Sequence, residues 1–196
     1  MRVLLIGCKG NMGQRYASIL KHLEVPFTGM DIEDRYFPSK YSHIIVATPT
    51  YTHLYFSKLF AADGRLTLIE KPLVTNKRDF NKLKKRLTDN IFMVNQYQYL
   101  TQEEDCGDTY WNYCKSGSDG LIWDAIQITH IAKGNCTIAN ESPVWTCELN
   151  GRQILLSQMD HAYIKMIKDF LGERKLCWGK DEIIKAHERV LGFKGK

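Results

Sequence analysis

The segment Tyr41–Leu73, YSHIIVATPTYTHLYFSKLFAADGRLTLIEKPL, decides the fold of this chain. An apolar run, His43–Ala47, ends at Thr48-Pro49-Thr50. After a helical stretch, a second apolar run, Leu66–Ile69, ends at Glu70-Lys71-Pro72. This is the pattern of two buried parallel strands joined by a crossover helix. Because ligands bind beyond the carboxyl ends of such strands, we expect both tripeptides to lie side by side on a binding rim, with a lysine available for chemistry.

The N-terminal residues predict a dinucleotide site on the same sheet. A short apolar strand, Arg2–Ile6, opens onto GCKGNMG at residues 7–13, one residue longer than the G-x-G-x-x-G fingerprint. Its glycines permit a tight turn and a close approach to a pyrophosphate at the N-terminus of the next helix. A second strand, Val25–Met30, ends at Asp31, whose carboxylate suits the ribose hydroxyls of NAD. Arg35 could instead pair with the 2′-phosphate of NADP.

The alternation of strands and helices predicts an α/β fold for residues 1–98. Thr75-Asn76 is expected to cap a further helix, and Ile91–Val94 reads as a fifth strand. Five strands alternating with helices indicate a doubly wound parallel sheet, a Rossmann domain, for which we predict the strand order 3-2-1-4-5.

Residues 99–196 predict a small α+β domain with a short antiparallel sheet. We expect three strands there, with a hairpin turn at Asn150-Gly151. We also expect a short helix within residues 103–115 and a longer helix that begins at Asp160. A last helix, Asp181–Leu191, is expected to pack against the Rossmann half. The exposed edge or face of the short sheet predicts a homodimer.

Composition and charge exclude several classes of function. The 196 residues carry a formal charge of +5, with basic residues scattered along the chain, which argues against nucleic-acid binding. No signal peptide and no apolar run of the roughly 20 residues that span a bilayer are present, so no membrane association is expected. The six cysteines form no CxxC pair and no zinc-type spacing with histidine. We therefore expect free thiols, a cytoplasmic location and no bound metal.

The motifs together resemble the Gfo/Idh/MocA oxidoreductases, the relatives of glucose–fructose oxidoreductase and inositol dehydrogenase. The resemblance rests on the glycine loop, Asp31, the segment Ala47–Thr50 with His53, and Glu70-Lys71-Pro72-Leu73. The Glu-Lys-Pro triplet is the most specific of these marks. It implies that Lys71 contacts the nicotinamide and the substrate and assists proton transfer, and that a cis peptide bond precedes Pro72. The family's second domain is usually much larger, so this chain resembles a short form.

The glycine loop, the acidic residue and the two rim segments define the expected cofactor contacts. These are Gly7, Lys9, Gly10, Asn11, Met12, Gly13, Asp31, Arg35, Thr48, Pro49, Thr50, His53, Glu70, Lys71, Pro72 and Gln96. The expected cofactor is NAD, with NADP as the alternative.

A second stretch, residues 119–134, resembles the family helix that carries an aspartate, a histidine and a second aspartate. Asp124 matches the first aspartate, Gln127 falls on the histidine, and His130 falls on the second aspartate. Glutamine cannot titrate, so His130, which shares a helix face with Gln127, could replace the missing base, or Lys71 could act alone. A structural role for His130 is equally open. The candidate catalytic residues are Lys71, His130 and Gln127.

The sequence motifs are compatible with three functions. The first is an NAD(P)-dependent oxidoreductase that transfers a hydride between nicotinamide and a secondary alcohol of a sugar, polyol or sugar derivative. The second is a dinucleotide-binding protein without turnover, which the reduced second domain and Gln127 favour. The third is an NAD-using lyase or epimerase. The partner expected in each case is a small molecule.

Overall fold

The structure is a computed structural model of the chain. It describes residues 1–31, 33–34, 40–100, 124, 127–128, 146–172 and 178–192, together with the backbone of two strands at 111–114 and 136–139. Arg35 and His130 lie outside the described residues.

A five-stranded parallel sheet forms the first half of the chain and confirms the predicted Rossmann-type fold. Its strands are β1 (Val3–Ile6), β2 (Phe27–Met30), β3 (His43–Val46), β4 (Leu66–Ile69) and β5 (Ile91–Met93). All four residues of β1 are fully buried, as a strand covered on both faces requires.

The observed strand order is β2-β1-β3-β4-β5, so the predicted order 3-2-1-4-5 is wrong. The burial of the strands gives the physical reason. In β3, Ile44, Ile45 and Val46 are fully buried, and such a strand belongs inside a sheet, where it pairs with β1 and β4. In β2, Thr28 and Gly29 are exposed, which suits an edge strand. The order reverses between β1 and β3, which is where sheets of this kind bind ligands.

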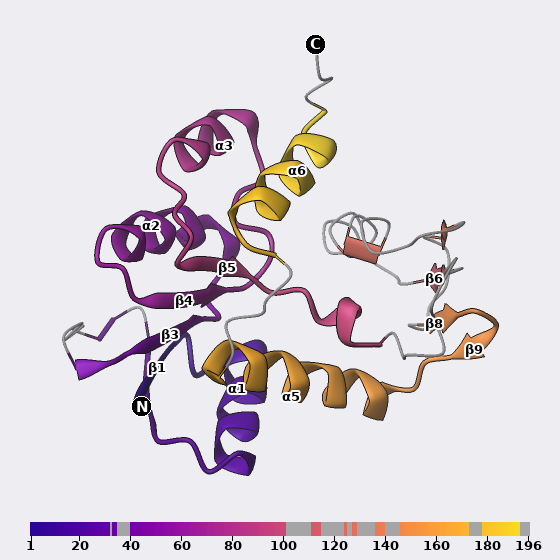
Figure 1. Cartoon of the computed structure of the whole chain (residues 1–196), viewed down its shortest axis with the longest axis horizontal. Helices are drawn as coiled ribbons and strands as arrows, with labels where there is room; N and C mark the ends of the chain where they lie inside the picture. The colour runs from indigo at the N-terminus through magenta and orange to yellow at the C-terminus, as the bar shows by residue number, and fades with distance from the viewer. Residues whose placement is uncertain are drawn as a thin grey trace.

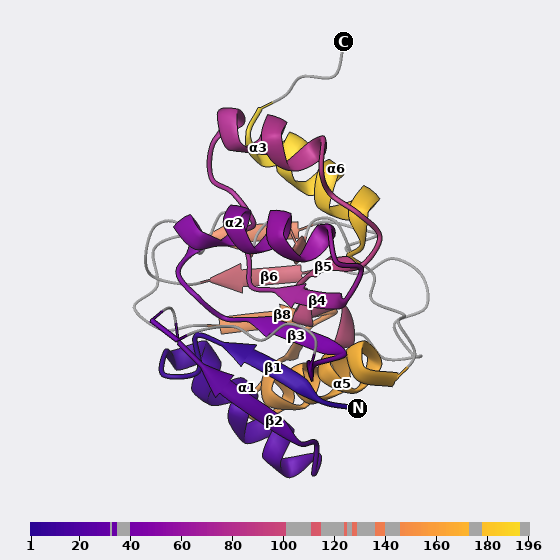
Figure 2. The same ribbon diagram turned by 90° about the vertical axis from the view of Figure 1, so that its left-hand side faces the viewer.

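Helices cover both faces of this sheet (Figures 1 and 2). One face carries α1 (Asn11–His22) and α5 (Leu156–Gly172), and the other carries α2 (Thr50–Ala61), α3 (Lys77–Lys84) and α6 (Lys180–Val190). The strand pleat divides the apolar residues accordingly, with Val3 and Leu5 of β1 in the first core and Leu4 and Ile6 in the second. Ile183 and Ala186 of α6 belong to this second core.

The second sheet has four strands in the order β7-β6-β8-β9. They are β6 (Trp111–Cys114), β7 (Cys136–Ala139), β8 (Thr146–Leu149) and β9 (Arg152–Gln153). The three predicted strands are present as β7, β8 and β9. Their predicted arrangement as a three-stranded antiparallel sheet is wrong, because β6 adds a fourth strand, which pairs with β7 in parallel and with β8 antiparallel. Within the segment 103–115, where a short helix was predicted, residues 111–114 form the strand β6, and aromatic side chains favour strands. Residues 103–110 lie outside the described residues.

The chain around the β8–β9 hairpin was predicted in part. Asn150 and Gly151 have φ values of 52° and 76°, which confirms the left-handed turn that the Asn-Gly pair indicated. The helix expected to begin at Asp160 begins earlier, at Leu156.

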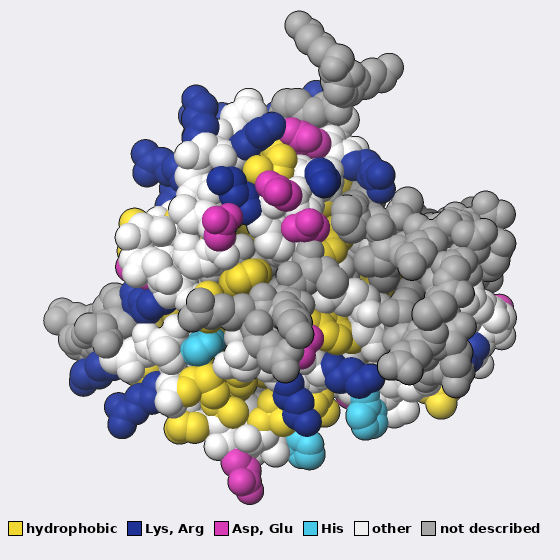
Figure 3. All heavy atoms as spheres, in the orientation of Figure 1, with side chains coloured by type: hydrophobic (Ala, Val, Ile, Leu, Met, Phe, Trp, Pro, Cys, Tyr) yellow, Lys and Arg dark blue, Asp and Glu magenta, His cyan; other side chains and the backbone are white. Residues whose placement is uncertain are grey.

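Two surface features bear on possible partners. Among the described residues, no helix is long and apolar enough to cross a membrane. On the face shown in Figure 3, the Lys and Arg side chains of the described residues lie dispersed among acidic and apolar ones and form no basic stripe there.

A buried histidine makes stability depend on pH. His187 of α6 is fully buried, its ring stacks on Phe80 at 5.7 Å, and burial lowers its pKa from 6.5 to about 4. Between these values the unfolded chain binds a proton that the folded chain does not, so stability falls as pH falls. Between pH 7 and pH 5, the free energy of unfolding of wild type should fall by about 2 kcal/mol more than that of His187→Phe, as measured by urea unfolding. Equal losses would contradict this assignment.

Candidate functional site

The glycine loop lies between the end of β1 and the start of α1. Gly7 has φ +84°, and a Cβ there would lie 2.6 Å from the carbonyl oxygen of Ala47, so the loop passes tightly against the end of β3. Gly10 is the N-cap of α1, and among the described residues no side chain caps this helix or places an acid in its first turn. The N–H groups of the first turn are therefore available to an anion such as a pyrophosphate.

Asp31 follows β2 and lies beside the glycine loop. Its carboxylate is 3.9 Å from Nζ of Lys9, with side-chain exposures of 24% and 75%. Its N–H donates a 2.7 Å hydrogen bond to Oδ2 of Asp34, which fixes the backbone at this turn. The geometry brings two of the predicted cofactor residues together.

His53 joins the two rim segments. It is buried in α2, with Nδ1 2.6 Å from the carbonyl oxygen of Pro72 and Nε2 2.7 Å from that of Thr48. Burial lowers the pKa of His53, and the two carbonyls oppose that effect. Since both ring nitrogens face the main chain, His53 holds the rim together. Thr48 is tied in further by a 2.6 Å contact between its hydroxyl and that of Thr52.

Glu70 points inward to a residue that sequence reasoning missed. Tyr16, fully buried on α1, donates a 2.5 Å hydrogen bond to Oε1 of Glu70, and the N–H of Lys71 donates one of 3.1 Å to Oε2. Burial and the Glu70 charge raise the pKa of Tyr16 well above its usual value. The carboxylate thus links the helix after the glycine loop to the backbone of Lys71. Only the position of Tyr16, three residues after Gly13, could have suggested this.

Removing the Tyr16 hydroxyl tests this link. We expect Tyr16→Phe to lower the free energy of unfolding by about 1.5–3 kcal/mol, because a buried carboxylate loses a charge-assisted hydrogen bond. Tyr163→Phe is the matched control: its ring is also buried, 6.1 Å from that of Tyr16, but its hydroxyl has a hydrogen bond with the partly exposed Arg15. In urea unfolding, Tyr163→Phe should lose clearly less free energy of unfolding than Tyr16→Phe. Equal losses would refute the Tyr16–Glu70 link.

Lys71 lies at the centre of a polar cluster. Its Nζ donates hydrogen bonds to Oδ1 of Asp124 and, at 3.0 Å, to Oε1 of Gln127. The side chains of Lys71 and Asp124 are 13% and 4% exposed, and Nζ lies 4.8 Å from the ring centroid of Tyr97. The Lys71–Pro72 peptide is cis, as the resemblance implied. The structure therefore brings Lys71 and Gln127 together and adds Asp124 as the ionic partner.

The amide of Gln127 has a fixed orientation. It is fully buried, and its Nε2 donates a 2.5 Å hydrogen bond to the carbonyl oxygen of Val94. Its oxygen therefore faces the ammonium of Lys71. Asp124, Gln127 and Ile128 have helical backbone, as predicted for this stretch.

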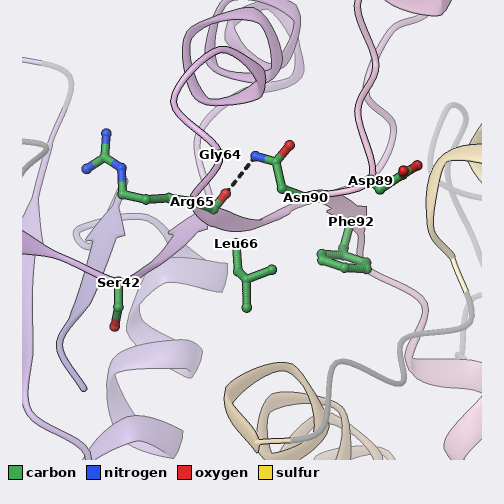
Figure 4. Close-up of a pocket in the computed structure, with 7 residues that line it drawn as sticks. All are labelled: Ser42, Gly64, Arg65, Leu66, Asp89, Asn90 and Phe92. Carbon is green, nitrogen blue, oxygen red and sulfur yellow. Dashed lines mark hydrogen bonds between the residues drawn. The ribbon is translucent and has the colours of Figure 1, made fainter.

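A hollow at the opposite end of the sheet is not a candidate site (Figure 4). It has a volume of about 560 Å³ and lies where β3, β4 and β5 begin, between Ser42, Leu66 and Phe92. The amide nitrogen of Asn90 in its wall already donates to the carbonyl oxygens of Phe60 and Arg65. The guanidinium of Arg65 already pairs with Asp63.

The chain has the fold of the Gfo/Idh/MocA-type dehydrogenases. It superposes on a Gfo/Idh/MocA family oxidoreductase from Vibrio cholerae with a TM-score of 0.71, at 10% identity, over 98% of this chain and 96% of the other. It superposes on a myo-inositol dehydrogenase from Corynebacterium glutamicum with a TM-score of 0.69, at 11% identity, over 97% of this chain and 94% of the other. The third structure is the WlbA dehydrogenase of Thermus thermophilus, solved with NAD and UDP-GlcNAcA. The TM-score is 0.65, at 13% identity, over 100% of this chain and 95% of the other. No family model and no curated protein matches the sequence. At this identity the likeness confirms the resemblance at the level of the fold.

Proposed function

We propose that the chain is an NAD-binding oxidoreductase that acts on a secondary alcohol of a sugar, polyol or sugar derivative. The observation that carries the proposal is the Lys71 ammonium, held by Asp124 and Gln127 at the carboxyl edge of the sheet. The WlbA dehydrogenase, whose fold the chain shares, was solved with NAD and a nucleotide sugar, which supports ligands of the same class here.

The residues present fit the cofactor. The uncapped N-terminus of α1 suits a pyrophosphate, and the carboxylate of Asp31 suits ribose hydroxyls. That carboxylate would repel a 2′-phosphate, so we propose NAD rather than NADP, with Lys9 at 3.9 Å weakening the preference. Bound NAD would supply the hydride acceptor or donor.

Lys71 would manage the substrate proton. In the direction of reduction, its Nζ donates a proton to the carbonyl oxygen while the carbonyl carbon receives the hydride. In the direction of oxidation, Lys71 first passes a proton to Asp124 and then takes the proton of the substrate hydroxyl. Gln127 accepts a hydrogen bond from Nζ and orients the ammonium without titrating.

A dinucleotide-binding protein without turnover is the second candidate. It is favoured by the Gln127 amide, whose oxygen and nitrogen are both engaged by the protein and which cannot replace a titrating imidazole. An NAD-using lyase or epimerase shares the same site and would leave the bound cofactor unchanged overall.

The test is to titrate purified protein with NAD, NADP and ADP-ribose, and then to follow the reduced-nicotinamide absorbance with polyols, sugars and nucleotide sugars. Binding of NAD together with a rise in absorbance for one class of alcohol supports the oxidoreductase. Binding without turnover favours the second candidate, and an isomeric product with retained cofactor favours the third. Failure to bind any nicotinamide dinucleotide overturns all three.

We also propose that the protein forms a homodimer through its second sheet. Strands β7 and β9 are the edges of this sheet, and Leu155 and Leu156, which follow β9, are 56% and 67% exposed. Sedimentation of wild type and of a Leu155→Glu, Leu156→Glu variant would measure the effect of this surface on assembly.

A further inference from the structure

Asn95 carries a buried amide with no hydrogen-bond partner. It follows β5 and is only 2% exposed, yet neither Oδ1 nor Nδ2 meets a partner in the part of the chain that the structure describes. Exchanging the two atoms would change nothing, since both lack partners. Native proteins pair nearly all such groups, because burying an unpaired amide costs free energy. The side chain is therefore available to a partner that the described residues do not supply.

The position of Asn95 places it in the proposed site. In the parallel pair β4–β5, Ile69 lies opposite Met93, so Lys71 and Asn95 each lie two residues beyond the paired ends of neighbouring strands. The residue before it, Val94, accepts the hydrogen bond from Gln127. The residue after it, Gln96, is also buried, and its Oε1 likewise meets no partner among the described residues. Unpartnered amide atoms thus gather at the rim where Lys71 is held.

We propose that Asn95 is a ligand-binding residue whose amide pairs with the primary carboxamide of a nicotinamide bound beside Lys71. This rests on the proposed function. A carboxamide offers one acceptor and two donors, so it can exchange two parallel hydrogen bonds with an asparagine side chain. The ammonium of Lys71 does not oppose a cationic nicotinamide, because Asp124 neutralises it. Neighbouring hydroxyls of the substrate offer the same donor–acceptor chemistry and form the alternative source.

Asn95→Leu tests the proposal, because leucine has a similar size and no polar atoms. Without ligand, the variant should unfold at the same urea concentration as wild type or a higher one, since the amide it removes is unpaired. Its affinity for NAD should fall about tenfold to a hundredfold, the effect of losing a hydrogen-bonded pair in a buried site. Its affinity for ADP-ribose, which lacks the nicotinamide ring, should not change.

Asn90→Leu is the matched control. Its amide nitrogen has partners at 2.9 Å and 2.8 Å, so this variant should unfold at a lower urea concentration and bind NAD as wild type does.

Three outcomes would overturn the assignment. Destabilisation of ligand-free Asn95→Leu would mean that buried water already satisfies the amide. Unchanged NAD affinity would show that the carboxamide is not its partner, and if substrate affinity fell instead, the amide would belong to the substrate. Equal weakening of NAD and ADP-ribose would exclude the nicotinamide end. In each of these cases wild type still binds NAD, and only a wild type that binds neither ligand would refute the proposed function itself.

Discussion

Lys71→Met is expected to lower the free energy of unfolding by about 3–5 kcal/mol, because it breaks a buried ion pair by removing the ammonium. The carboxylate of Asp124 is 4% exposed and faces the ammonium that the variant removes. Methionine keeps most of the side-chain volume, so packing changes little. Urea unfolding measures the loss, and the same variant should show no turnover, because Lys71 is the proposed proton donor to the substrate oxygen.

Two further variants separate charge from packing. The double variant Lys71→Met, Asp124→Leu should recover most of the lost stability, because it removes the buried carboxylate as well as the ammonium. Lys82→Met is the control, since its pair with Asp79 is exposed, at 45% and 32%, and such pairs contribute less than about 1 kcal/mol. If Lys71→Met were no more destabilising than Lys82→Met, the Lys71–Asp124 pair would not be a buried ion pair.

Gly13→Ala is the second change with a large expected effect. A Cβ at this position would lie 2.0 Å from the carbonyl oxygen of Gly7 and 2.8 Å from Cα of Cys8. Both are backbone atoms, so no side-chain rotation relieves the clash and α1 must move away from the loop. We expect a loss of about 3 kcal/mol or more in urea unfolding.

Gly10→Ala should behave in the opposite way. Its φ of −72° is open to any residue, and the nearest atom to an added Cβ is the carbonyl oxygen of Gly7 at 3.5 Å. The fold should therefore keep its stability. The methyl group would occupy the space where a pyrophosphate approaches the N-terminus of α1, so NAD and ADP-ribose affinities should fall at least about tenfold. Normal affinity would show that this loop is not the pyrophosphate site.

The fold was predictable wherever the signal was local. The apolar runs of β1, β3 and β4, the glycine loop and the Asn150-Gly151 turn each depend on neighbouring residues, and the structure has all of them. The strand order depended on relative burial: the weakly apolar FTGM of β2 indicated an edge strand, but only by comparison with β3.

The site was predictable in its residues but not in its contacts. Lys71 and Gln127 were expected together because the family resemblance aligned both of them with site residues. The role of Tyr16 was not expected, because no motif marks this residue as the partner of Glu70. The buried amide of Asn95, which meets no partner among the described residues, could not be predicted either, since a sequence does not show which polar groups lack partners.

The two helices that come last in the chain decide when the first sheet can be completed during synthesis. The carbonyl oxygen of Trp178 accepts a 3.2 Å hydrogen bond from Met93, and α5 covers the same core as α1. A nascent chain that has released only its first 100 residues leaves apolar surface bare on both sides of its strands. We therefore expect this half to expose apolar surface during synthesis until the C-terminal helices emerge, which favours aggregation in the interval.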